Sequence, residues 1–149
     1  MSADCRLTVT VRPACDAGEI EAAMDLRVRV FCGEQGVSRE EELDGLDEQS
    51  TQIVALDESG VIATCRLRFP EGGTCKLERM AVEQRLRELG VGARLLAGAE
   101  SEAGERGAST MLLHAQRRAE RFYASSGYVA EGDTFLSAGI EHVRMRKVL

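Results

Sequence analysis

The sequence contains no tryptophan, and only four phenylalanines and two tyrosines stand among its 149 residues. Leucine, valine, isoleucine and alanine must therefore supply most of the core. No apolar run is long enough to cross a bilayer, and no apolar segment of the kind found in a secretory leader stands near the N-terminus. These absences argue against a membrane partner and against export, so we expect a cytoplasmic protein.

The cysteines show neither a disulfide pattern nor a metal-binding pattern. There are five of them, and none stands in a CxxC spacing. The first two flank an expected strand whose length, roughly 33 Å for about ten residues, is far beyond disulfide reach. Because the two histidines are far apart and outside any HxH or HExxH motif, we expect no metal site. The cysteines are Cys5, Cys15, Cys32, Cys65 and Cys75.

The net charge of −6 argues against a nucleic-acid partner, since phosphate binding needs clustered lysine and arginine. Much of the acid stands in one segment, residues 40–48, which reads EEELDGLDE. Two interpretations stay open for this segment. It is either a solvated loop with a short helix, or an acidic rim that attracts a cationic amine.

Hydrophobic periodicity predicts one α/β domain over residues 1–149, with a mixed sheet and the order β-α-β-β-β-α-β-α-β-β. A first helix begins at Ala17, carries an apolar stripe and ends at Gly33 and Gly36. A second helix follows the turn at Arg87 and stops near residues 104–107. A third covers residues 117–126 and ends at a glycine. The expected stripe is Ile20, Met24, Val28 and Phe31, and that of the second helix is Val91, Leu95, Leu96, Ala99 and Ala103.

The strands are expected at residues 7–11, 53–56, 61–69, 75–82, 111–115, 128–129 and 142–148. The run 111–115 is apolar and short, which is typical of a strand buried on both faces.

The turn over residues 87–93 carries the strongest chemical signal. Gly90 and Gly92 let the backbone curl and a phosphate approach closely, and the next helix begins there with unpaired N–H groups. A Rossmann fingerprint would need a third glycine where Leu95 stands, and a Walker loop would need Gly-Lys-Ser/Thr, which is absent. The turn therefore favours a pyrophosphate ligand of another kind.

Two motifs together make the sequence resemble the GNAT acetyltransferases. The first is Arg87-x-x-Gly90-x-Gly92 after a strand, and the second is Phe122-Tyr123 followed after three residues by Gly127 and Tyr128. Residues 29–37 and 142–145 look like the ElaA/YjcF-like bacterial subgroup. The resemblance implies a mostly antiparallel sheet of six or seven strands flanked by about four helices, with strands 4 and 5 splayed apart.

The resemblance also implies acetyl-CoA as co-substrate, held between the splayed strands. In the common form of the family a glycine stands where this chain has Glu88, and the frequent asparagine after strand 5 is replaced by Gln116. Neither departure removes a backbone N–H group. The implied cofactor-binding residues are Met80, Ala81, Val82, Arg87, Glu88, Leu89, Gly90, Val91, Gly92, Ala93, Gln116 and Tyr123.

Tyr123 is the first candidate catalytic residue, because the resemblance places its hydroxyl near the CoA sulfur, where a phenol can protonate the thiolate. The alternative is a packing tyrosine. Glu78 is the candidate general base, and a salt bridge with Arg66, Arg68 or Arg79 is an equal alternative. The N–H of Met80, beside a bulge of strand 4, is placed to hold the thioester oxygen.

The acceptor side has no decisive motif. Glu34, Gln35 and His114 are candidate substrate-binding residues, with a helix-end role or a hydrogen-bonded core role as alternatives. His142, near the last hairpin, has the same two interpretations as His114. We expect the acceptor to contact the first helix, the acidic segment and the last hairpin.

No cysteine is placed as a nucleophile, so direct attack in a ternary complex is expected. The sequence thus predicts an acyltransferase, an N-acetyltransferase of a small amine or amino sugar. A peptide amine as acceptor, or a non-catalytic acyl-CoA sensor on the same fold, stays open. A homodimer through the terminal strands also stays open.

Overall fold

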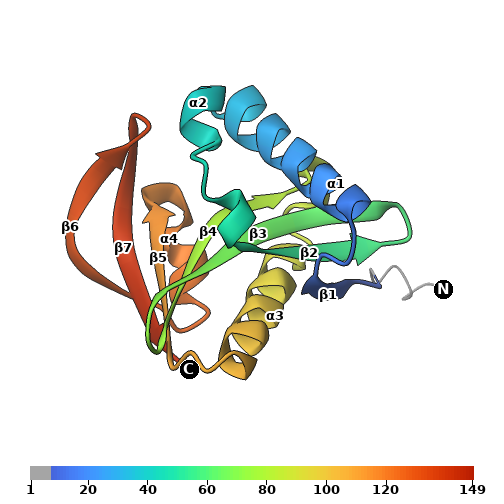
Figure 1. Cartoon of the computed structure of the whole chain (residues 1–149). Coiled ribbons are helices and arrows are strands. Elements are labelled where there is room, and N and C mark those ends of the chain that lie inside the picture. Colours follow the sequence, from blue (N-terminus) through green and yellow to red (C-terminus); the bar gives the residue numbers. More distant parts are fainter. Residues whose placement is uncertain (1–7) are drawn as a thin grey trace.

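The structure, a computed structural model, describes residues 8–149, except for the side chain at position 71. Seven strands form one sheet in the order β1-β2-β3-β4-β5-β7-β6 (Figure 1). They are β1 (Thr10–Pro13), β2 (Thr51–Asp57), β3 (Gly60–Glu71), β4 (Thr74–Val82), β5 (Thr110–Gln116), β6 (Val129–Ser137) and β7 (Ile140–Val148). All neighbours are antiparallel except β4 and β5. The predicted fold class and element order are confirmed.

Strands β4 and β5 pair over only part of their length. Their parallel register runs from Thr74 opposite Thr110 to Leu77 opposite Leu113. Beyond that point β4 continues to Val82 with β3 as its partner, and β5 continues to Gln116 with β7 as its partner. The sheet therefore opens between the carboxyl ends of these two strands, as the sequence predicts.

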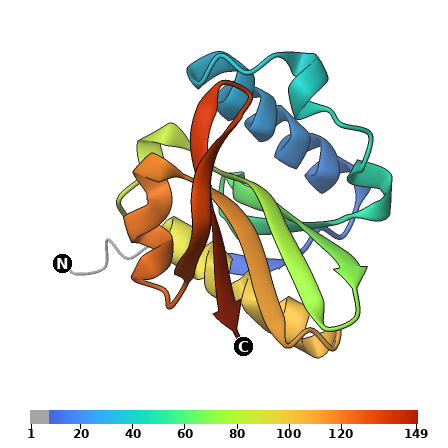
Figure 2. The ribbon, with the colours of Figure 1, turned by 90° about the vertical axis from the view of Figure 1, so that its left-hand side faces the viewer.

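Helices cover both faces of the sheet, with α1 (Ala17–Arg27) on one face and α3 (Val91–Glu105) on the other (Figure 1). The main core includes α3 and α4 (Glu120–Ala124), while α1 packs through a smaller apolar cluster with Ala81 of β4. The α3 stripe is confirmed, since all five predicted side chains are buried. The tip of the β6–β7 hairpin rises to the level of α2 (Arg39–Glu42) (Figures 1 and 2).

The predicted stripe of α1 is right only in part: Met24, Val28 and Phe31 are half-buried, and Phe31 packs against a core cluster, but Ile20 is not buried. Ile20 is 44% exposed, whereas Ala23, Leu26 and Arg27 are buried. The buried face includes a charged side chain, which a search for apolar residues counts as solvent-facing. The helix continues as a π-helical turn, Val28–Glu34, and the chain reverses at Gly36, whose φ is 73°.

Strand β5 is not buried on both faces. Its burial alternates, with Met111, Leu113 and Ala115 facing the core and His114 exposed. The other face of the sheet has no helix packed over β5, so an apolar run here does not mean two covered faces. His114 is accordingly not a core residue.

Three boundaries differ from the expectation. Strand β1 runs from Thr10 to Pro13, because an edge strand tolerates proline; residue 7 of the expected strand lies outside the described residues. Strand β6 extends to Ser137, far beyond residues 128–129, because its mostly exposed side chains give no apolar signal. The third predicted helix begins with a 3-10 turn, Arg117–Ala119, and α4 ends at Ala124.

Candidate active site

One cavity of about 1480 Å³ opens where β4 and β5 diverge. The sequence predicts sixteen residues for the site, and fourteen of them line this cavity. The two exceptions are Leu89, which is 59% exposed, and Val91, which is buried in the core. For these two residues, only the backbone N–H was expected to bind the pyrophosphate. The lining ones are Glu34, Gln35, Glu78, Met80, Ala81, Val82, Arg87, Glu88, Gly90, Gly92, Ala93, His114, Gln116 and Tyr123.

A β-bulge interrupts β4 beside the cavity. Thr64 of β3 stands opposite Ala81 and Arg66 stands opposite Glu78, so one residue of β3 faces two of β4. The first of these two is Arg79, whose φ of 57° lies in the left-handed region. A bulge leaves an extra residue out of the ladder and turns the strand locally. The kink therefore lies at Arg79 and Met80, where the sequence analysis placed the group that holds the thioester oxygen.

The turn before α3 is shaped for an anion by its backbone. Glu88 and Gly90 have positive φ, 66° and 84°, and Gly90 caps α3 without a side-chain hydrogen bond to the helix. The first N–H groups of the helix therefore have no partner within it, at the positive end of its dipole. A Cβ on Gly92 would lie 3.3 Å from the Phe122 ring, so this position is closed to larger residues.

The guanidinium of Arg87 is held by two partners. It donates to the carbonyl oxygen of Val82 at 2.9 Å and forms a bidentate pair with Glu34 at 2.6 and 3.0 Å. Glu34 belongs to the π-helical turn that follows α1. This pair ties the end of the first helix to the phosphate-binding turn.

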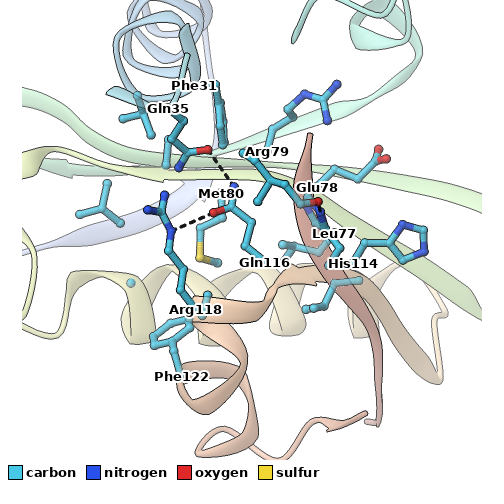
Figure 3. A pocket seen from close by; sticks show the side chains of 18 of the residues that line it. Phe31, Gln35, Leu77, Glu78, Arg79, Met80, His114, Gln116, Arg118 and Phe122 are labelled. Carbon is cyan, nitrogen blue, oxygen red and sulfur yellow. Dashed lines mark hydrogen bonds between the residues drawn. The ribbon is translucent and has the colours of Figure 1, made fainter. Parts of the chain in front are cut away.

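A chain of side-chain hydrogen bonds crosses the cavity at the end of β5 (Figure 3). The amide nitrogen of Gln116 donates to Gln35 at 2.8 Å, and its amide oxygen accepts from Arg118 at 3.0 Å. Figure 3 shows Gln116 between Gln35, above, and Arg118 and Phe122, below. The amide thus links the element after α1 with the segment leading into α4.

Tyr123 lies at the middle of the cavity and is 8% exposed. Its hydroxyl donates to the thioether sulfur of Met80 at 3.6 Å, and its ring meets Phe122 edge to face. Burial, with a smaller contribution from Cys65, raises the pKa of Tyr123 well above its ordinary value. The phenol is therefore protonated at neutral pH, and its only recorded acceptor among the described residues is a weak one.

The carboxylate of Glu78 is surrounded by cations. It accepts from Arg66 at 2.9 Å and from Arg68 at 2.6 Å, and Lys76 lies 3.4 Å away. Burial opposes ionisation of Glu78, but the hydrogen bond from Arg68 and the charge of Arg66 prevail and lower its pKa to about 2. The salt-bridge alternative is therefore realised with Arg66 and Arg68, while Arg79 pairs elsewhere. A carboxylate held in this way is a weak proton acceptor.

The acidic segment is only in part a solvated loop with a short helix, since Glu40, Glu41 and Glu48 are exposed but its other three carboxylates are paired with arginines. Glu42 is 1% exposed and bonds the fully buried Arg27 at 2.8 Å. Asp44 pairs with the buried Arg66, and Asp47 bonds both arginines. These three carboxylates therefore serve to hold the segment over the sheet, and they are not available to attract an amine.

Arg79 completes this network from the bulge. Its guanidinium donates to the carbonyl oxygens of Glu41 and Glu42 and lies 3.2 Å from Asp44. The strained backbone of β4 and the last turn of α2 are thereby fixed to one another, so α2 forms a wall of the cavity.

Two histidines stand on the open face of the β5–β7–β6 sheet. His114 packs edge-on against Phe135, and His142 stacks on the same ring at 5.8 Å. Nδ1 of His142 lies 2.7 Å from the carbonyl oxygen of Ile140. Burial, followed by the charges of Lys76 and Arg144, lowers the pKa of His114.

Several lining residues were missed by the sequence analysis. Lys76 shares its strand face with Glu78, so the alternation of β4 would have revealed it. Phe122 stands within the second motif. Arg118 and the hairpin residues Ser137 and Ala138 carry no signal that marks them. The expected acceptor segments, namely the first helix, the acidic segment and the last hairpin, all contribute to the lining.

The splayed strands, the bulge and the turn before α3, whose helix start has no side-chain cap, define a GNAT-type acyltransferase site. Residues 19–149 match the family model described as an acetyltransferase (GNAT) domain, so the chain belongs to the GNAT family and is an acyltransferase.

The similarity extends over nearly the whole chain. The uncharacterized N-acetyltransferase YjcF of Bacillus subtilis is 38% identical over 130 residues, which cover 87% of this chain and 92% of YjcF. An acyl-CoA N-acyltransferase from Pseudomonas aeruginosa superposes with a TM-score of 0.82 at 27% identity, covering 95% of this chain and 99% of the other. ElaA of Escherichia coli, with a TM-score of 0.81 at 21% identity and coverages of 94% of this chain and 99% of the other, shares the fold.

Among residues 8–149, no helix is long and apolar enough to span a membrane.

Proposed function

We propose that this chain transfers the acetyl group of acetyl-CoA to the primary amine of a small molecule, by direct attack within a ternary complex. The observation that carries the proposal is that one cavity reaches from the start of α3, past Tyr123, to α2 and the β6–β7 hairpin. We call the first part the donor half, made by residues 80–82, 87–93, Gln116, Phe122 and Tyr123. The acceptor half is made by Phe31, Gln35, Lys76, Glu78, Arg79, His114, Ser137, Ile140 and His142.

In the donor half, acetyl-CoA is held mostly by the backbone. The free N–H groups at the start of α3 suit its pyrophosphate, and the open edges of β4 and β5 suit its amide-bearing arm.

At the reacting centre, the N–H of Met80 at the bulge stabilises the oxyanion that forms when the amine attacks the thioester carbon. Tyr123 then gives its proton to the departing thiolate. Its hydroxyl already faces a sulfur atom, that of Met80, and burial keeps it protonated. We assign Glu78 an anchoring role, because its carboxylate is occupied by Arg66 and Arg68.

The test compares wild type with Tyr123→Phe on a panel of primary amines that includes glucosamine, putrescine and lysine, with released CoA measured by a thiol reagent. We expect the variant to lose about 100-fold in kcat, with an unchanged acetyl-CoA Kd by calorimetry. Tight acetyl-CoA binding without turnover of any amine, and without any effect of the substitution, would instead identify an acyl-CoA sensor.

A further inference from the structure

The proposed reaction needs a proton acceptor on the acceptor side. An alkyl amine arrives mainly as an ammonium ion at neutral pH, and the ion has no lone pair with which to attack. Glu78 is the carboxylate nearest in sequence to the bulge, but three cations occupy it and its pKa lies near 2. Glu34 is paired with Arg87, and Glu41 closes the capping box of α2 with Ser38. These carboxylates of the cavity wall all have other partners.

His142 is differently placed. Its Nδ1 lies 2.7 Å from the carbonyl oxygen of Ile140. Because a carbonyl oxygen can only accept, the proton of this hydrogen bond must be on Nδ1. In the neutral ring the lone pair is therefore on Nε2. Phe135 stacks on the imidazole at an interplanar angle of 22°, which fixes the plane of the ring.

The register of the sheet brings His142 to the border between the two halves of the cavity. His142 stands directly opposite Gln116, the last residue of β5 and a residue of the donor half. Side chains of directly opposed residues lie on the same face, with Cβ atoms about 4.5–5.5 Å apart. Both residues line the cavity. His142 is therefore part of the wall that an amine bound in the acceptor half would face.

His114 has the same chemistry but a poorer position. It stands opposite Arg144, two residues further from the open end of β5. Burial, followed by the charges of Lys76 and Arg144, lowers the pKa of its ring and disfavours a second proton there. It therefore serves as the natural control for a role that depends on taking up a proton.

We propose that Nε2 of His142 is the general base for the acceptor amine, a role that rests on the acetyl transfer proposed above. An ammonium N–H bond breaks, its proton goes to Nε2 and its electron pair stays on nitrogen. That pair forms the bond to the thioester carbon, and the C–S bond then breaks with its electrons on sulfur. The hydroxyl proton of Tyr123 goes to sulfur, and the remaining excess proton of the new amide nitrogen restores the phenol.

Titratable and charged groups face this part of the sheet from each neighbouring element. The polar neighbours without charge are Gln35 and Gln116. The titratable and charged ones are Glu41 of α2, Lys76, Glu78 and Arg79 of β4, His114 of β5, Arg118 of the 3-10 turn before α4, Glu131 of β6 and Arg144 of β7.

The experiment measures kcat/KM against pH for wild type, His142→Gln and His114→Gln, on every panel amine that wild type acetylates. We expect His142→Gln to lose about 100-fold at pH 7, to regain activity as pH rises toward the pKa of the amine, and to be partly rescued by added imidazole. His114→Gln changes the same wall of the acceptor half, so its KM for the amine should change, but it should keep the pH dependence of wild type and gain nothing from added imidazole. Acetyl-CoA Kd should be the same in all three proteins, which separates the loss from a folding or donor-binding defect.

Two results would overturn the inference while leaving acetyl transfer in place. One is a His142→Gln variant with the rate and pH profile of wild type. The other, which needs no turnover, is a ring-nitrogen NMR spectrum that shows His142 protonated on Nε2 and not on Nδ1. If wild type acetylates no amine at all, the proposed function fails first and the base role fails with it.

Discussion

The donor half and the acceptor half of the cavity are built from different chemical groups. The donor half depends on the backbone: a bulge, two positive-φ residues and a helix start with free N–H groups. The acceptor half depends on side chains, with Arg27 and Arg66 fully buried among carboxylates from the segment around α2. Under the proposed function, backbone geometry would recognise what every acyl-CoA shares, while the side chains of the other half would be free to differ between acceptors.

The largest expected effect comes from a substitution that disturbs the acceptor half and leaves the donor half intact. Arg27→Met would leave the carboxylate of Glu42, which is 1% exposed, with only Arg79, 3.3 Å away, to balance its charge. Removing one partner of a buried ion pair costs about 3–5 kcal/mol, so we expect Tm to fall by about 10 °C. At low temperature, the folded variant should bind acetyl-CoA as wild type does and acetylate amines poorly. Thermal unfolding measures the loss of stability, and calorimetry measures whether the donor half still binds acetyl-CoA.

The matched control is Arg27→Met with Glu42→Leu, which removes both charges of the pair. It should recover much of the lost stability, because the buried carboxylate that lost a partner is gone. A folded Arg27→Met protein that no longer binds acetyl-CoA would show that the two halves are not independent.

The second largest expected effect is a loss of stability at low pH, through Glu78 of the acceptor half. The pKa of Glu78 is about 2 in the folded protein against an ordinary value of 4.5. The unfolded chain therefore binds more protons in this window, and the stability that Glu78 contributes is present above pH 4.5 and is lost as pH falls toward 2. We expect at most about 3 kcal/mol of unfolding free energy to be lost in this way, measured by urea denaturation between pH 5 and 3.

Glu78→Gln is the control for the acid effect. The variant cannot release this proton, so its stability should fall less steeply over the same pH range. An identical slope in both proteins would assign the acid sensitivity to other carboxylates, such as Asp44, whose pKa the hydrogen bond from Arg66 also lowers.

The same contrast explains what the sequence could predict. The turn before α3 is a local motif, so Gly90, Gly92 and the α3 stripe were found from spacing alone. The acceptor half is made by pairs such as Arg27 with Glu42 and Arg66 with Asp44, which lie 15 and 22 residues apart. Neither hydrophobic periodicity nor a local motif shows that two such residues form a pair. A buried arginine therefore cannot be told from a surface arginine by sequence until its partner is known.

Errors elsewhere have the same origin. Ile20 was predicted on the buried face of α1 and is exposed, because the spacing of apolar residues gave no sign that Arg27 is buried. The position of His142 opposite Gln116 follows from the antiparallel pairing of β5 with β7. The sequence predicted both strands but could not give their register, so it could not bring this histidine to the edge of the donor half.

The smallest expected effect comes from substituting Glu88 in the donor half. Glu88 is exposed and has a φ of 66°, a conformation that favours glycine. Glu88→Gly should relieve this strain and stabilise the fold by about 1 kcal/mol, a rise of about 3 °C in Tm. It should also tighten acetyl-CoA binding, because a carboxylate beside the pyrophosphate is removed while the backbone N–H stays.

Glu88→Ala separates these two causes, since alanine removes the charge but keeps a Cβ at positive φ. We expect it to tighten acetyl-CoA binding as the glycine variant does, without the rise in Tm. Equal stabilisation by alanine and glycine would show that the strain at position 88 is negligible and that charge repulsion alone sets the effect. Weaker binding in both variants would mean that the carboxylate itself contacts the cofactor, so that the donor half is not built from backbone alone.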